Sequence, residues 1–239
     1  IYLPYIYLPF EGRWVERSET RRGFTHTQNI CRYAHTVYMC TAITYSPKNF
    51  YFGRTLDADT NYSADVVTTP RGFLFENIEC RHAIIGAAIV SGGRPLFFDG
   101  MNECGVCMAG LNFGSARYFP EREGMLNLAQ YELLPYILGN CTSAAEATAE
   151  LGRINITTKR FAPDMPPAPL HWLVADRESA FTAECMEGGM RICKNTVGVL
   201  TNDPPFACHM RGLSNYMHLT AAPPQNLFGA EGAEEYCAG

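Results

Sequence analysis

The sequence predicts an α+β fold, because stretches with strand patterns outnumber and surround those with helical patterns. A hairpin is expected around residues 46–49, a β-meander over residues 170–194, and helices over residues 125–138 and 143–151. The chain has 239 residues, 47% of them apolar, which is enough for one or two domains with a sizeable core.

The hairpin is predicted from the turn sequence SPKN at residues 46–49. Proline presets φ at the second position of a turn, and Ser or Asn suits the ends. β-branched and aromatic residues flank the turn, as strands prefer. If residues 46 and 49 pair, Cys40 faces Thr55. Arg54 then returns to the start of the first strand, beside Cys40, with Asp57 just beyond.

This grouping has a chemical use. A nearby guanidinium such as that of Arg54 favours a thiolate, the nucleophilic form of cysteine. If Met39 is removed, Cys40 also carries an α-amine with a pKa of roughly 7.7 to 8.0, and Asp57 could orient this base. The alternative is a buried structural Cys40 beside a surface ion pair of Arg54 and Asp57.

The remaining elements follow from apolar periodicity and turn residues. Pro135 should kink or break the first helix, while Ser143 begins the second with a capping box and Gly152 ends it. Residues 99–102 are expected to form a turn and residues 154–169 a proline-bearing loop. Further strands are expected over residues 65–70, 84–90, 105–113, 170–175, 180–186, 190–194 and 197–200, and a third helix over residues 208–219.

Composition excludes several classes of function. The formal net charge is −5 and no basic stripe occurs, so nucleic-acid binding is not expected. No apolar run approaches the roughly 20 residues that span a bilayer. The ten cysteines are expected to be mostly reduced core residues of a bacterial cytoplasmic protein. Cys104 and Cys107 could belong to a metal-binding module, but no second pair completes a zinc site. His171 is expected to be a core histidine.

Several motifs in order resemble the choloylglycine hydrolase family, which contains bile salt hydrolases and penicillin V acylases. The resemblance runs from Met39 nearly to the end of the chain. The motifs are MCT at 39–41, FGRTLD at 52–57, DGMNE at 99–103, AGLNF at 109–113, LHW at 170–172 and GVLTN at 198–202. The resemblance implies the four-layer α-β-β-α sandwich of N-terminal nucleophile hydrolases.

The resemblance also implies cleavage of the amide bond of glycine- or taurine-conjugated bile acids, without a metal or organic cofactor. Cys40 would be the nucleophile, Arg54 would tune it and Asp57 would position its amine. Asn112 and Asn202 would hold the oxyanion, and asparagine at position 112 favours bile salts over penicillin V. Candidate substrate contacts are Leu56, Phe98, Phe161 and Met165. The last two could equally be ordinary loop packing.

The ends of the chain depart from the family pattern. Residues 1–38 are interpreted as an upstream segment or propeptide, and residues 39–239 as a truncated hydrolase domain, because the family's further catalytic arginine has no counterpart. The alternatives are a penicillin V or other N-acyl amide acylase with the same machinery or, because of these ends, an inactive remnant. A full-length form is expected to be a homo-oligomer.

Overall fold

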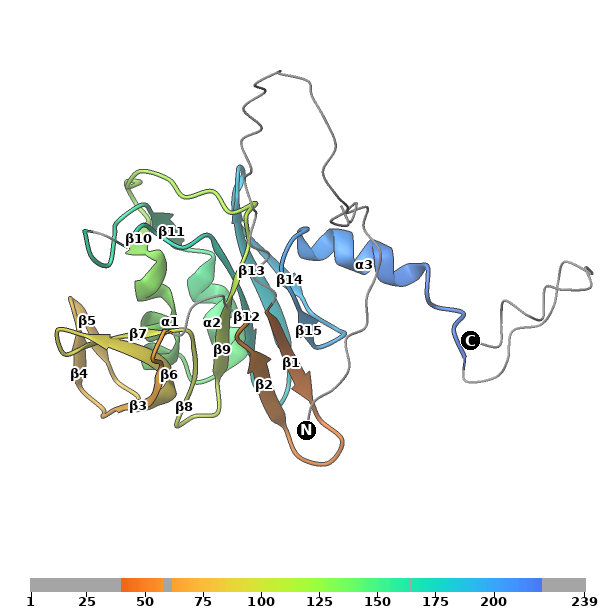
Figure 1. Cartoon of the computed structure of the whole chain (residues 1–239), viewed down its shortest axis with the longest axis horizontal. Helices are drawn as coiled ribbons and strands as arrows, with labels where there is room; N and C mark the ends of the chain where they lie inside the picture. Colours follow the sequence, from red (N-terminus) through yellow and green to blue (C-terminus); the bar gives the residue numbers. More distant parts are fainter. Residues whose placement is uncertain (1–39, 58–61, 164, 221–239) are drawn as a thin grey trace, which may run out of the picture. The chain divides into compact units, whose positions relative to one another are not determined.

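The computed structural model describes residues 40–57, 62–163 and 165–220. The expectations for residues 1–39 lie outside this part of the chain. Two sheets dominate (Figure 1). The smaller sheet has the order β15 (Val199–Leu200), β1 (Thr41–Tyr45), β2 (Tyr51–Thr55). The larger sheet has the order β14 (Gly189–Lys194), β13 (Ala180–Met186), β12 (Leu170–Ala175), β9 (Cys107–Asn112), β8 (Asp99–Asn102), β6 (Ile84–Ser91), β3 (Asp65–Thr69), with β7 (Arg94–Phe97) also paired to β6.

Three helices and two small sheets complete the described elements. The helices are α1 (Gln130–Asn140), α2 (Ala144–Leu151) and α3 (Phe206–Ser214). The small sheets pair β4 (Phe73–Phe75) with β5 (Ile78–Cys80) and β10 (Leu126–Ala129) with β11 (Ile154–Thr157). No helix in the described ranges is long and apolar enough to cross a membrane.

The larger sheet is covered on both faces near β9 and β12. Trp172 and Val174 pack into one apolar cluster with α1 and α2, while Leu173 and Ala175 pack into a second cluster with Ala42 of the smaller sheet. Successive side chains of a strand point to opposite faces, so a strand covered on both faces is apolar throughout. Figure 1 shows α1 and α2 on the side of the large sheet away from β1 and β2. The described residues therefore form helix, sheet and sheet layers.

The predicted meander over residues 170–194 is confirmed by β12, β13 and β14, which pair as antiparallel neighbours. The second helix is also confirmed, because the Ser143 hydroxyl accepts the Glu146 N–H at 3.1 Å and Gly152 caps the end. The Glu146 carboxylate accepts from the backbone and hydroxyl of Thr142 rather than from Ser143.

Three local predictions were wrong. Residues 126–129 form strand β10 before the helix, residues 154–157 form strand β11, and residues 99–102 form strand β8 rather than a turn. The helix also continues past Pro135 to Asn140. These strands have only four residues each, and such short segments fit helix, strand and turn patterns alike until a partner strand decides between them.

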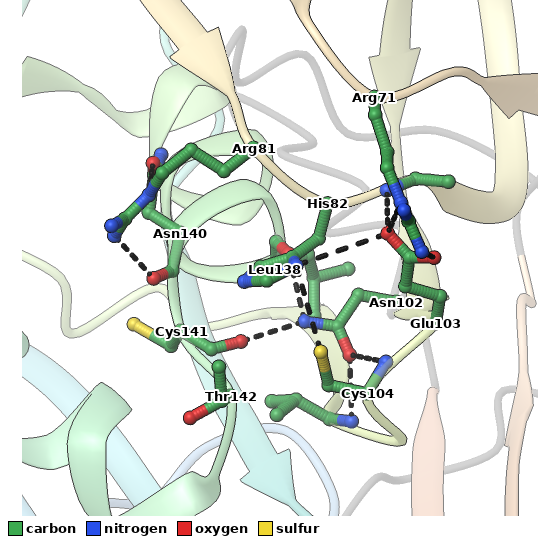
Figure 2. A network of polar contacts seen from close by, with 12 residues as sticks. Arg71, Arg81, His82, Asn102, Glu103, Cys104, Leu138, Asn140, Cys141 and Thr142 are labelled. Carbon is green, nitrogen blue, oxygen red and sulfur yellow. Dashed lines mark hydrogen bonds and ion pairs between the residues drawn. The ribbon is translucent and has the colours of Figure 1, made fainter.

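A polar network ties the turn after β8 to the end of α1 (Figure 2). The buried Asn102 side chain donates to the carbonyl oxygens of Leu138 and Cys141, at 2.8 and 2.7 Å. Its carbonyl oxygen accepts the N–H groups of Cys104 and Val106, at 3.0 and 2.9 Å. One side chain thus satisfies helix-end acceptors and turn donors that would otherwise lack partners.

The Cys-x-x-Cys pair belongs to this region. Cys104 is exposed, with Sγ 3.6 Å from Nδ1 of His82, whereas Cys107 is buried and its pKa is raised to about 12 by burial. The two thiols therefore occupy different environments. Within the described residues, no three metal-ligating side chains gather.

Candidate active site

The hairpin of β1 and β2 exists, but the predicted register was wrong by one residue. Thr41, rather than Cys40, faces Thr55, because the connecting loop holds residues 46–50 instead of a four-residue turn. A one-residue change of register moves a strand's side chains to the other face of the sheet.

This shift decides where Arg54 points. Arg54 faces Ala42, so its side chain shares a face with Ala42 and with Cys40, two positions earlier. The predicted register would have put Arg54 on the face opposite to Cys40. The hairpin therefore brings thiol and guanidinium to one side of the smaller sheet, towards the larger sheet.

Cys40 is 4% exposed and lies directly before β1. Its N–H donates to Oδ1 of Asn202 at 2.6 Å, and its carbonyl oxygen accepts the Thr201 hydroxyl at 2.9 Å. In this chain the Cys40 nitrogen is a peptide nitrogen, since Met39 precedes it. The same atom would be an α-amine in a chain that began at Cys40, and Asn202 would then be its acceptor.

Arg54 is buried and bonded to the larger sheet. Its Nη2 donates to the carbonyl oxygen of Gly110 at 2.9 Å, and its Nη1 lies 3.5 Å from Oδ2 of Asp99. Burial raises the pKa of the Asp99 carboxyl, opposed by the Ala87 N–H and by Arg54. The surface ion pair of Arg54 with Asp57 is not formed. Asp57 is exposed and makes no ion pair with other described residues.

The two candidate asparagines lie next to Cys40 and to each other. Asn112 is the last residue of β9, and its carbonyl oxygen accepts Nδ2 of Asn202 at 2.7 Å. The Asn202 amide thus bridges the Cys40 nitrogen and the Asn112 carbonyl. Residues far apart in the sequence are joined here by two hydrogen bonds.

A cavity of about 270 Å³ opens at this point. A larger hollow of about 420 Å³ lies elsewhere, and one of about 610 Å³ shares Arg54 and Leu56 with this cavity; neither includes Cys40 or Asn112. The smaller cavity is lined by Cys40, Arg54, Leu56, Asp57, Tyr62, Leu96, Phe97, Phe98, Gly110, Asn112, Gln130, Ala168, Pro169 and Leu170. Its wall is largely apolar, with a few polar side chains such as those of Arg54, Asp57 and Asn112, as is typical of small-molecule sites.

Two of the four expected substrate contacts, Leu56 and Phe98, line this cavity. Phe161 instead packs edge-on against Tyr131, with ring centroids 5.1 Å apart, and Met165 packs against the same core cluster. Neither residue lines this cavity, and both pack in or against the apolar core cluster.

Other lining residues were not predicted from the sequence, among them Tyr62, Leu96 and Gln130. They come from a loop, from β7 and from the start of α1. No local pattern distinguishes them, because only the packing of these elements brings them to the cavity. Asp99, the partner of Arg54, lies in the DGMNE motif at 99–103, but the sequence predicted no role for it.

His171 is completely buried, which confirms the expectation of a core histidine. Its Nε2 lies 2.5 Å from the Thr201 carbonyl oxygen, and its Nδ1 lies 3.3 Å from Oε1 of Glu184. The ring stacks on Phe113 at 4.4 Å. His171 therefore contacts Thr201, in the segment that binds Cys40, and does not line the cavity.

Comparison with known proteins identifies relatives of this chain. Residues 40–237 match the profile of the linear amide C–N hydrolases, choloylglycine hydrolase family. The bile salt hydrolase/transferase of Lactiplantibacillus plantarum is 40% identical over 196 residues, covering 80% of this chain and 60% of that protein. The conjugated bile acid hydrolase of Lactobacillus gasseri is 35% identical over 191 residues, covering 76% of this chain and 60% of that protein.

Solved structures agree with these relatives. A variant of the conjugated bile acid hydrolase from Clostridium perfringens superposes with a TM-score of 0.74 at 28% identity, covering 77% of this chain and 60% of that chain. Penicillin V acylase from Agrobacterium tumefaciens has a TM-score of 0.61 at 20% identity, covering 76% and 57%, a likeness of fold alone. The α+β class and the N-terminal nucleophile hydrolase type of fold are thereby confirmed. The chain spans about 60% of the length of the curated relatives that it matches.

Proposed function

The chain belongs to the choloylglycine hydrolase family of linear amide C–N hydrolases, and from this membership we propose that it hydrolyses glycine- or taurine-conjugated bile acids with Cys40 as nucleophile. The observation that carries the proposal is the hydrogen bonding of Cys40 to Asn202, and of Asn202 to Asn112, next to a largely apolar cavity that Cys40 and Asn112 line. Relatives named as bile salt or conjugated bile acid hydrolases support the choice of substrate.

In the proposed first step, the Cys40 thiol attacks the amide carbonyl of the substrate and its proton passes to the α-amine of the same residue. This amine exists only when the residues up to Met39 have been removed. Its ordinary pKa of roughly 7.7 to 8.0 suits a base that works near neutral pH. Asn202 accepts from this nitrogen, and Asp57 in the cavity wall is proposed to help position it.

The tetrahedral intermediate carries a negative oxygen. Asn112 and Asn202 are proposed to donate to it, because preorganised donors aimed at a developing oxyanion lower the barrier of acyl transfer. Arg54, buried beside the cavity, is proposed to favour the thiolate. The carbon–nitrogen bond then breaks, and the proton held by the amine goes to the leaving glycine or taurine.

A thioester of Cys40 remains. Water attacks the thioester, and the α-amine takes a proton from this water. The Cys40 thiolate then leaves and recovers that proton from the amine. The free bile acid is released, and the enzyme returns to its starting state. The apolar wall of the cavity, including Leu56 and Phe98, is proposed to contact the bile acid. Apart from the substrate and water, these proposed steps use only groups of the chain itself.

The test begins with intact mass and N-terminal sequencing of the purified protein, to identify a chain that starts at Cys40. Release of glycine from glycocholate and of taurine from taurocholate is then measured, with penicillin V as a parallel substrate. Cys40→Ala should lower turnover at least about a thousandfold. Cys104→Ala is the matched control, since Cys104 is an exposed thiol outside the cavity, and it should retain activity.

Three results would contradict the proposal. Turnover of a bile conjugate by Cys40→Ala would exclude the nucleophile. Hydrolysis of penicillin V alone, by a chain that starts at Cys40, would favour the acylase alternative. A mature chain that cleaves none of these amides would be an inactive remnant.

A further inference from the structure

The residue after Asn202 makes a contact that the proposed mechanism does not use. The carboxylate of Asp203 accepts the N–H of Gly114 at 2.5 Å, and the N–H and hydroxyl of Ser115 at 3.2 and 2.5 Å. Gly114 and Ser115 follow Asn112 by two and three positions. The carboxylate therefore joins the end of the strand that carries Asn112 to the segment that carries Asn202.

We infer that Asp203 is a positioning residue that sets the relative placement of the Asn112 and Asn202 amides. The inference rests on the proposed function for its catalytic meaning. Hydrogen bonds to an ionised carboxylate are shorter and stronger than neutral ones. Three of them converge on one side chain adjacent to Asn202, so a shift of Asn202 relative to Asn112 would have to break them.

Besides the hydrogen bonds to Cys40 and Asn112, three further contacts hold the segment of residues 201–203, and Asp203 makes one of them. The carbonyl oxygen of Thr201 contacts His171 at 2.5 Å, and that of Asn202 contacts His209 at 2.9 Å. These two contacts hold the segment to the larger sheet and to α3. Asp203 adds to the direct Asn202–Asn112 bond by binding the residues just after Asn112, and it is exposed, so its substitution leaves the apolar core intact.

Placement matters because oxyanion donors act only at short range, about 2.7 to 3.1 Å from the oxygen that they stabilise. A misplacement near 1 Å can cost about a hundredfold in rate. Asn202 also accepts from the Cys40 nitrogen. Its displacement would therefore disturb both the proposed oxyanion site and the proposed base.

The kinetic test uses Asp203→Ala, Asp203→Asn and Ser115→Ala with glycocholate. Asp203→Ala should lower kcat about 10- to 100-fold with KM changed less than about threefold, because the donors act in the transition state. In Asp203→Asn only one side-chain oxygen remains to accept from the three donors, so kcat should fall nearly as much. Ser115→Ala removes one donor and should lose less.

The matched control is Asp176→Ala. The Asp176 carboxylate also accepts several backbone N–H groups, those of Ala144, Glu178 and Ser179, but outside the cavity. It should retain kcat. A kcat of Asp203→Ala within about threefold of the wild type, or an equal loss in Asp176→Ala, would overturn the inference.

A double-mutant cycle separates positioning from general stability. If Asp203 acts through Asn202, then Asp203→Ala should reduce kcat by a smaller factor in an Asn202→Ala background than in the wild type. The two factors should differ at least about tenfold. If Asp203 only supported the fold, its replacement would reduce kcat by the same factor in both backgrounds and would lower Tm. Additive losses would therefore overturn the inference.

A second readout needs no turnover, so it separates failure of this inference from failure of the proposed function. In ¹⁵N-labelled protein, the side-chain amide signals of Asn112 and Asn202 should shift in Asp203→Ala and stay in place in Asp176→Ala. Unchanged amide signals in Asp203→Ala would overturn the positioning role even if the wild type cleaved no conjugate.

Discussion

Single residues on the surface also affect stability, and Glu103 is the clearest case outside the candidate active site. Its carboxylate accepts from Nε and Nη2 of Arg71, at 2.7 and 2.5 Å, and from the N–H of Ala83 at 3.0 Å. The Arg71 hydrogen bond, followed by the Ala83 N–H, lowers the pKa of Glu103 from 4.5 to about 2. The fold therefore favours the ionised form.

The sign of the pH dependence follows from this direction. A carboxyl with a lowered pKa contributes stability that is complete above its unfolded pKa, here 4.5, and that is lost as the pH falls towards 2. Glu103→Gln should thus unfold more easily than the wild type at pH 7. The difference in free energy of unfolding should shrink between pH 5 and pH 2.5, as urea titrations followed by tryptophan fluorescence would show.

Glu121→Gln serves as control for the Glu103 variant, because Glu121 is exposed and forms no ion pair with other described residues. It should change the free energy of unfolding little at any pH. A deficit of Glu103→Gln that stays constant down to pH 2.5 would contradict the assigned role of the carboxylate.

Motifs in the sequence identified Cys40, Asn112 and Asn202, and the structure brings these three into contact. The ion pair of Arg54 with Asp99 could not be predicted in the same way. It depends on how β2 lies against β8, and these strands belong to different sheets. Local sequence contains no information on such a contact until the packing of the sheets is known.

At the level of elements, the turn between β8 and β9 and the end of α1 depend on one side chain. Asn102 is 2% exposed and makes four hydrogen bonds, two as donor and two as acceptor. Asn102→Ala would leave these buried groups unsatisfied, each at about 1 to 3 kcal/mol. We expect a loss of at least about 3 kcal/mol in the free energy of unfolding, measured with urea.

Asn140→Ala is the control for this variant. Asn140 is only partly buried and bonds to Arg81 and to the Tyr136 carbonyl within the same region. Its replacement should cost about 1 kcal/mol or less. Equal losses for Asn102→Ala and Asn140→Ala would show that the network does not depend on Asn102.

Elements differed in how well the sequence specified them. The meander over β12, β13 and β14 was predictable because each strand is long and each turn carries clear breakers. The hairpin was predictable as a hairpin but not in register, since a five-residue loop and a four-residue turn share the same turn residues. Strands β10 and β11 were missed because each is stabilised by the other across a long separation in sequence.

On the scale of the whole described region, the order of strands in the sheets could not be predicted from the sequence. β9 pairs with β12 and β8, and β6 lies between β8 and β3, an arrangement that non-local contacts determine. The layering was predictable only through the family resemblance, which implied a four-layer sandwich. Burial of both faces of β9 and β12, each face in a separate apolar cluster, supplies the physical reason for three of those layers.

The outer face of the smaller sheet leads to a prediction about association. Ile43, Tyr45, Tyr51 and Val199 are 44%, 63%, 55% and 40% exposed, and they are cross-strand neighbours: Ile43 pairs with Val199, and Tyr45 with Tyr51. Adjacent exposed apolar side chains on a sheet favour contact with other molecules. The described chain should therefore associate with itself as its concentration rises, and sedimentation velocity would measure this.

Threonine retains strand propensity while removing apolar surface. The double variant Ile43→Thr/Tyr51→Thr should therefore stay monomeric at concentrations where the wild type associates, with little change in Tm. Leu74→Thr tests specificity, because Leu74 is 64% exposed but lies in the separate sheet of β4 and β5. If Leu74→Thr suppressed association as strongly as the double variant, general surface hydrophobicity, and not this face of the smaller sheet, would be the cause.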